Sequence, residues 1–162
     1  MMTRPQITDS KMLAEYIHGD RAVMQLVGPA GTSHTYLFAR PRNADDFPPD
    51  IRFVYVIHED KHFYIGMLEG KKFRCTAHSR FSEDCESVKG AHYIVKLAYS
   101  QTLLNKTPMK LYQSGYCARC GRELGSKFGY AHGFGKSCWM KHITRREMEE
   151  ALYANSRFET VQ

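Results

Sequence analysis

The stretch Cys117-Ala-Arg-Cys120-Gly-Arg122 is followed, after a glycine-rich segment, by Cys138-Trp-Met-Lys-His142. The spacing is C-x2-C, then seventeen residues, then C-x3-H. Two cysteines separated by two residues form a tight knuckle, whose backbone N–H groups can donate to the thiolates. A second pair of ligands about twenty residues later completes the tetrahedral Cys3His set that structural Zn²⁺ commonly takes. The pattern therefore predicts a structural zinc finger.

The fourth ligand is predicted from helix geometry. Cys138 and His142 are four residues apart, so both project from one face of a helix that begins there. We therefore expect His142 to be the fourth ligand, and His132 in the preceding loop is the alternative. A knuckle, a glycine-rich hairpin and a helix that carries the last ligands make up a treble-clef finger. The competing interpretation is that the cysteines are reduced and packed as small apolar side chains.

Positive charge is concentrated in the same part of the chain. The 162 residues carry a net charge of +6, but residues 105–146 contain nine lysines and arginines and one acidic residue, Glu123. Cations beside aromatic side chains suit the phosphates and bases of nucleic acid. An equally open interpretation is that the glycines and aromatics serve only the turns and core of the finger. The residues predicted to contact nucleic acid are Arg119, Arg122, Lys127, Lys136, Lys141, Arg145, Arg146, Phe128, Tyr130 and Phe134.

The rest of the chain predicts an α+β fold, in which an antiparallel sheet is covered by a helix. A short apolar stripe indicates a helix over residues 9–18. A second helix, over residues 86–104, has an apolar face that can cover the sheet. A final helix follows Cys138. Segments rich in β-branched and aromatic residues indicate strands over 22–27, 32–39, 51–57, 62–68 and 72–75, with an edge strand over 109–112.

These elements suggest four parts of the chain. They are an N-terminal segment with a short helix (1–20), an α+β sheet domain (21–112), a zinc finger with its C-terminal helix (113–155) and a tail (156–162). The chain has no apolar run of about eighteen residues and no apolar segment near its start, so we expect neither a membrane span nor a signal peptide. Five cysteines, three of them explained by metal, indicate a reducing compartment such as the cytoplasm.

The cysteine-rich motif resembles a domain family of uncharacterised function found in many phage and bacterial proteins. The similar residues are Cys117-x-x-Cys120-Gly-Arg-x-Leu124, then Gly133-x-Gly135 and Cys138. The resemblance covers about residues 50–140 and is specific only in the finger. It implies a zinc-bound finger and a phage-associated origin, which would place the protein in the host cytoplasm, but it implies no reaction. The family usually has proline where this chain has Lys136, and it has no fixed histidine matching His142.

Three functional hypotheses follow. In the first, a small phage-type accessory protein binds nucleic acid through its basic finger. In the second, the chain is a protein-binding module that inhibits or redirects a host protein with an acidic surface. The third is an enzyme with its active site in the sheet domain, but no acid/base pair or activated nucleophile stands out in the sequence. The first hypothesis leads the second by a small margin.

Overall fold

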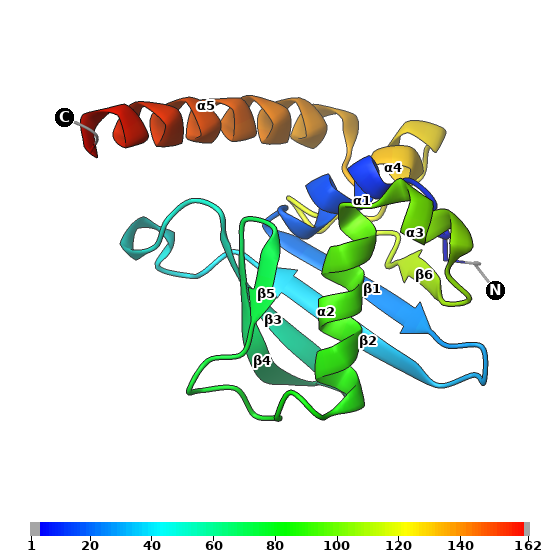
Figure 1. Cartoon of the computed structure of the whole chain (residues 1–162). Helices are drawn as coiled ribbons and strands as arrows, with labels where there is room; N and C mark the ends of the chain where they lie inside the picture. Colours follow the sequence, from blue (N-terminus) through cyan, green and yellow to red (C-terminus); the bar gives the residue numbers. More distant parts are fainter. Residues whose placement is uncertain (1–3, 161–162) are drawn as a thin grey trace.

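The computed structural model describes residues 4–160, and a curled antiparallel sheet of six strands forms its centre (Figure 1). The strand order is β5-β4-β3-β2-β1-β6, so every predicted strand is present and the predicted edge strand lies beside β1. Residues 1–3 of the predicted N-terminal segment and residues 161–162 of the predicted tail lie outside the described range. The strands are β1 (Arg21–Val27), β2 (Ser33–Ala39), β3 (Ile51–His58), β4 (Lys61–Glu69), β5 (Lys72–Arg74) and β6 (Lys110–Gln113).

The β3–β4 hairpin shows how local chemistry sets the register of the sheet. Its two turn residues, Glu59 and Asp60, have φ angles of 51° and 63°. Positive φ at both central residues matches the right-handed twist of a two-residue hairpin. The turn pairs Ile57 with His62, and a register shift between Val54 and Tyr55 then marks a bulge. Bulges bend a strand and increase its twist, which fits the curl of the sheet.

Helix α2 (Glu86–Ala98) packs across one face of the sheet, as predicted (Figure 1). The hydroxyl group of Tyr36 on β2 donates a hydrogen bond of 2.6 Å to the carbonyl oxygen of Ser87. Gly90 makes this approach possible, because a Cβ at that position would lie 2.2 Å from the same hydroxyl oxygen. The short 3-10 helix η1 (Ala44–Asp46) lies in the loop before β3.

The predicted single helix over 86–104 is two helices. α2 ends at Ala98, and α3 (Gln101–Lys106) begins after Ser100. The side chain of Ser100 accepts a hydrogen bond from the backbone N–H of Leu103, which is the contact of a helix N-cap. The apolar pattern continues across this break, which is why the sequence predicted one helix.

Helix α1 (Ser10–Ile17) is capped by Asp9, whose side chain accepts from the N–H of Lys11, and it lies between the sheet and the C-terminal helices (Figure 1). Tyr16 is fully buried, and its hydroxyl group donates to the carbonyl oxygen of Val23 at 2.7 Å. On the other side, Gly133 packs so closely that a Cβ there would lie 2.5 Å from the Tyr16 ring. Likewise, a Cβ at Gly19, at the end of α1, would lie 2.7 Å from the Cβ of Ala118.

The glycine-rich segment is helical, which corrects the predicted hairpin. Helix α4 (Lys127–His132) is capped by Ser126, whose hydroxyl group accepts from the N–H of Gly129. Gly133 ends the helix with a φ of 77°, the left-handed conformation that favours glycine after a helix. Helix α5 (Lys136–Thr160) follows and continues through most of the predicted tail. The treble-clef arrangement therefore remains unconfirmed, although the C-terminal helix is present.

One apolar core joins the predicted parts of the chain. Cys117, Ala118, Leu124 and Phe134 belong to the same buried cluster as the sheet, α1 and α2. The cysteine-bearing segment thus packs as an extension of the sheet core. None of the helices within residues 4–160 has the length and apolar character needed to cross a membrane.

Arg52 on β3 is buried and ties the end of α1 to the strand. Its guanidinium group donates to the carbonyl oxygens of Gly19 and His18, both at 2.7 Å, and to those of Pro49 and Ile51. Burial lowers its pKa to about 10, which still leaves the side chain charged at neutral pH. The carbonyl oxygens at the end of α1 are therefore satisfied by one side chain.

We expect Arg52→Leu to lower the free energy of unfolding by about 3 kcal/mol or more, because buried carbonyl groups lose their donor. Chemical denaturation measures this change. The matched control is Arg74→Leu, at an exposed side chain 3.8 Å from Glu69, for which we expect a change within about 0.5 kcal/mol. Equal effects of the two substitutions would contradict this role for Arg52.

Candidate metal centre

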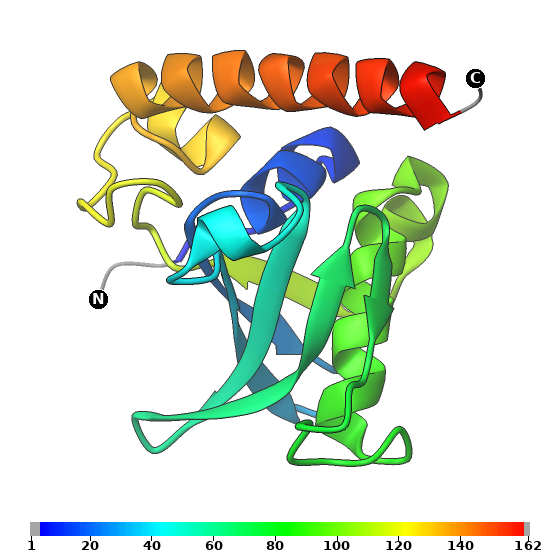
Figure 2. The same ribbon diagram turned by 90° about the vertical axis from the view of Figure 1, so that its left-hand side faces the viewer.

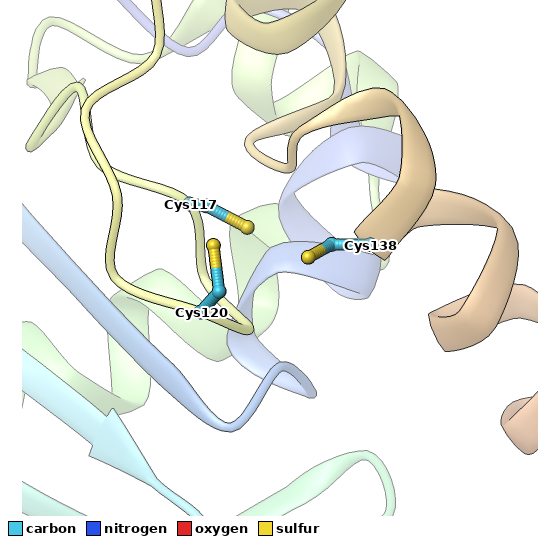
Figure 3. Close-up of side chains that lie close together, drawn as sticks. All are labelled: Cys117, Cys120 and Cys138. Atoms are coloured by element: carbon cyan, nitrogen blue, oxygen red, sulfur yellow. The ribbon is translucent and has the colours of Figure 1, made fainter.

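Three cysteine side chains converge at one point between the knuckle and the first turn of α5 (Figure 3). The sulfur atoms of Cys117, Cys120 and Cys138 all lie within 4.8 Å of one another. Cys117 is buried, Cys138 half-buried and Cys120 exposed. Three thiol groups at this separation could hold a metal ion.

The knuckle that carries two of these cysteines is a small hairpin. Tyr116 and Glu123 form a β-bridge, and the N–H of Cys117 donates to the carbonyl oxygen of Arg122 at 2.8 Å. Gly121 supplies the positive φ of 77° that the turn requires. The spacing of the first two cysteines thus produces the predicted knuckle.

Backbone N–H groups point at the Cys117 sulfur atom. Arg119 from the knuckle and Gly135 from the segment before α5 both donate to it, with N···S distances of 3.4 Å. Burial raises the pKa of the Cys117 thiol, but N–H donors from Cys120, Gly135 and Arg119 outweigh it and lower that pKa overall. The geometry is therefore prepared for a thiolate at this position.

The pKa of the neighbouring Cys138 thiol shifts in the opposite direction, upward. Burial, together with the nearby sulfur atoms of Cys120 and Cys117, raises the pKa of Cys138. Closely spaced thiols cannot all ionise without compensating positive charge, since each thiolate repels the next. A bound divalent cation supplies that charge and favours the thiolate form of all three.

Neither predicted histidine ligand belongs to the cysteine group in the described structure. His142 is fully buried, and its Nε2 atom lies 2.7 Å from a carboxylate oxygen of Glu15 on α1. Its ring stacks on Phe134, with centroids 4.4 Å apart. The Nδ1 atom of His132 lies 2.9 Å from the carbonyl oxygen of Phe128. The structure thus brings together three of the predicted ligands, and it places both histidines in other contacts.

Glu15 is a residue that the motif did not reveal. Besides His142, it contacts Arg146 at 3.4 Å, and Arg145 nearby pairs with Asp20 at 2.8 Å. Burial opposes ionisation of Glu15, but the hydrogen bond from His142 and the charge of Arg146 lower its pKa below the ordinary value. These contacts attach the first turns of α5 to α1. Nothing local in the sequence around Glu15 indicates them.

The predicted basic surface separates into two groups. Arg122, Lys127, Lys136 and Lys141 are exposed, and among the side chains described for residues 4–152 no carboxylate lies within 4 Å of any of them. The half-buried Arg145 and Arg146 instead form ion pairs with acidic residues of the body. Arg119 is half-buried beside Cys138.

The predicted aromatic contacts are mainly internal. Phe134 is fully buried beneath α5, so its predicted role in base stacking is corrected to one in the core. Tyr130 is half-buried and donates its hydroxyl proton to the carbonyl oxygen of Leu124. Phe128 is half-buried and stacks on His132 with centroids 4.1 Å apart.

A hollow of about 770 Å³ adjoins the cysteine group. It lies between the knuckle and the face of the sheet opposite α2, and Cys117 and Cys120 form part of its wall. Three arginines, Arg4, Arg21 and Arg119, also line it. Arg4 and Arg21 were not among the predicted site residues, because they are far from the motif in sequence.

Comparisons with family models, with curated proteins and with solved structures find no match to this chain.

We expect Cys138→Ser to abolish metal binding and to lower the stability of the whole chain, because the cysteine group shares the core of the sheet. Elemental analysis of the purified protein and its thermal midpoint measure the two effects. The control is Cys85→Ser, at a half-buried cysteine next to α2, which should keep both metal content and most of the stability. Retention of full metal content by Cys138→Ser would contradict the assignment.

The variant His142→Asn distinguishes a metal ligand from a residue that only holds α5 against the body of the protein. Because the imidazole contacts Glu15 and Phe134, we expect this variant to lose about 1–3 kcal/mol of stability and to retain its metal ion. Absorption spectra of the Co²⁺-loaded protein should be unchanged. A shift of the Co²⁺ bands in His142→Asn, but not in the exposed-site control His58→Asn, would instead identify His142 as a ligand.

Proposed function

We propose that this chain is a small nucleic-acid-binding protein whose cysteine group holds a structural zinc ion. The supporting observation is that four exposed cations, unpaired among the described side chains, lie on the knuckle, on α4 and on the first turns of α5, the segment that contains the three cysteines. A metal ion there would connect the knuckle to α5 and so hold cations from both segments in one arrangement.

Zinc is the metal that the donor set favours. Thiolates are soft ligands, and Zn²⁺ in tetrahedral structural sites commonly takes three or four of them. Cys117, Cys120 and Cys138 would supply three positions, with the N–H groups around Cys117 as supporting donors. The fourth position is open to a donor outside this group.

The charge distribution supports a polyanionic ligand. Arg122 is on the knuckle, Lys127 at the start of α4, and Lys136 and Lys141 on the first turns of α5. Phosphate groups bind such cations by releasing condensed counterions, so affinity falls steeply with salt. Unpaired cations can bind phosphates without first breaking an ion pair, which sets these four apart from Arg145 and Arg146.

A second candidate function is binding to a protein partner. On α5, Met140, Met148 and Leu152 are 61%, 61% and 65% exposed. Their spacing by multiples of four residues places them on one side of the helix. An exposed apolar stripe of this kind is suited to a partner protein, and a host protein recovered with the purified chain would favour this function.

From the cysteine motif we also propose a phage origin, and from the cysteine content a cytoplasmic location.

For the nucleic-acid function, we expect the metal-loaded protein to bind DNA or RNA with an affinity that falls as salt is raised. The triple variant Arg122→Ala, Lys127→Ala, Lys136→Ala should bind much more weakly. If each cation contacts one phosphate, the slope of log affinity against log salt should shrink by about 0.7–0.9 per cation removed. Fluorescence anisotropy over a salt series measures both quantities.

The control removes three exposed cations of α2 and α3, as Lys89→Ala, Lys96→Ala, Lys106→Ala. This variant has the same net charge as the triple finger variant, so it tests whether position matters. Equal losses in the two variants would show that only overall charge is involved. No binding by the unmodified protein at low salt would rule out the nucleic-acid function.

A further inference from the structure

The face of the sheet opposite α2 carries a row of aromatic side chains. Along β3, Val54 and Val56 are buried against α2, whereas Phe53, Tyr55 and Ile57 alternate with them and are half-buried. Side chains alternate between the two faces of a strand, so these three point away from α2. In Figure 2 this side of the sheet extends below the cysteine-bearing segment, with α2 on the other side.

The aromatic side chains contact one another in sequence. The ring centroids of Phe53 and Tyr64 are 5.8 Å apart, and those of Tyr64 and Tyr55 are also 5.8 Å apart. His62 continues the row at 6.2 Å from Tyr55, and Phe47 extends it at the other end, 5.3 Å from Phe53. The contacts of Tyr64 with Tyr55 and with Phe53 are edge-to-face. The rings therefore form a continuous apolar surface and are not stacked in parallel on one another.

Cations lie at one end of this aromatic row. The hollow beneath the knuckle is lined by Ile57 and His62 from the sheet, and by three arginines, Arg4, Arg21 on β1 and Arg119 on the knuckle. Burial raises the pKa of Tyr55, and the charge of Arg42 partly opposes this shift. The two carboxylates that line the hollow, Glu59 and Asp60, are in the β3–β4 turn.

We infer that this face binds single-stranded nucleic acid, with bases against Tyr55, Tyr64 and His62 and with phosphates near Arg21, Arg4 and Arg119. The inference rests on the proposed nucleic-acid function and specifies its ligand and site. Aromatic rings offer a surface on which unpaired bases stack, and guanidinium groups offer charge to the backbone. A duplex hides the faces of its bases, so it cannot use the rings in this way.

The placement of charge also orients the strand. Glu59 and Asp60 repel phosphates from the turn, so the backbone lies on the knuckle side of the hollow. Arg119, which lines the hollow, and Arg122 are on the same knuckle, so the knuckle carries cations of both the sheet-face site and the finger surface. An acidic protein would satisfy the arginines, but it has no bases to stack on the aromatic row.

The experiment compares binding of a fluorescent single strand of about twelve nucleotides with binding of a duplex of the same length, using the metal-loaded chain. Tyr55→Leu should weaken single-strand binding at least about fivefold. Arg21→Ala should weaken it and reduce the salt slope by about 0.7. The controls Tyr99→Leu and Lys89→Ala, on exposed side chains at the end of α2 and on α2, should leave binding unchanged. Circular dichroism and the thermal midpoint verify that each variant is folded.

The outcomes distinguish this inference from the proposed function. If the triple finger variant loses binding while Tyr55→Leu and Arg21→Ala do not, the finger binds nucleic acid and the inference about the sheet face is wrong. If the sheet-face variants lose binding and the finger variant does not, the inference holds and the proposed finger surface is wrong. Equal affinity for duplex and single strand, or no binding of either, overturns the inference.

Discussion

The close packing of α1 against the cysteine-bearing segment is the contact on which the arrangement of the molecule depends. Gly133 lies against the ring of Tyr16, and Gly19 lies against Ala118, in each case with no room for a Cβ atom. The backbone N–H of Arg21 donates to the carbonyl oxygen of Ala118 at 2.7 Å, which extends the contact to the first strand. Close packing of this kind has little tolerance for added volume.

This contact changes how a metal ion would act. Because Cys117, Ala118 and Phe134 belong to the same core as the sheet, a metal held by the three cysteines would stabilise the whole chain. A small finger on a flexible linker would behave differently, since its folding would depend on metal while the rest of the chain did not. The shared core also fixes the position of the knuckle over the open face of the sheet, where the hollow forms.

Helix α5 depends on a second set of contacts, centred on Glu15. Removing a carboxylate from water is costly unless it is paired, and the half-buried Glu15 has His142 and Arg146 as its partners. Arg145 and Arg146 hold the helix in place through ion pairs, whereas Lys136 and Lys141 on its first turns are exposed and can bind a ligand. The helix therefore has a basic, anchored beginning and, farther along, the exposed apolar positions Met148 and Leu152.

Much of this arrangement was predictable from local patterns. The C-x2-C spacing produces the knuckle, period-two alternation produces the strands, and the apolar stripes of α1 and α2 are visible in the sequence, because each depends on neighbours within a few residues. The break at Ser100 and the helix after Ser126 are local too, but their capping signals were outweighed by a continuous apolar pattern and by the glycines.

Other features depend on residues that meet only in the folded chain. His142 contacts Glu15 across 127 positions of sequence, and no spacing rule could show that its imidazole has a partner other than metal. The burial of Phe134 and the pairing of Arg145 with Asp20 have the same origin. The hollow needs Arg4, Arg21 and Arg119 from three separate segments. Sequence patterns thus specify the elements and the cysteine group, whereas long-range packing decides which charges and rings remain exposed.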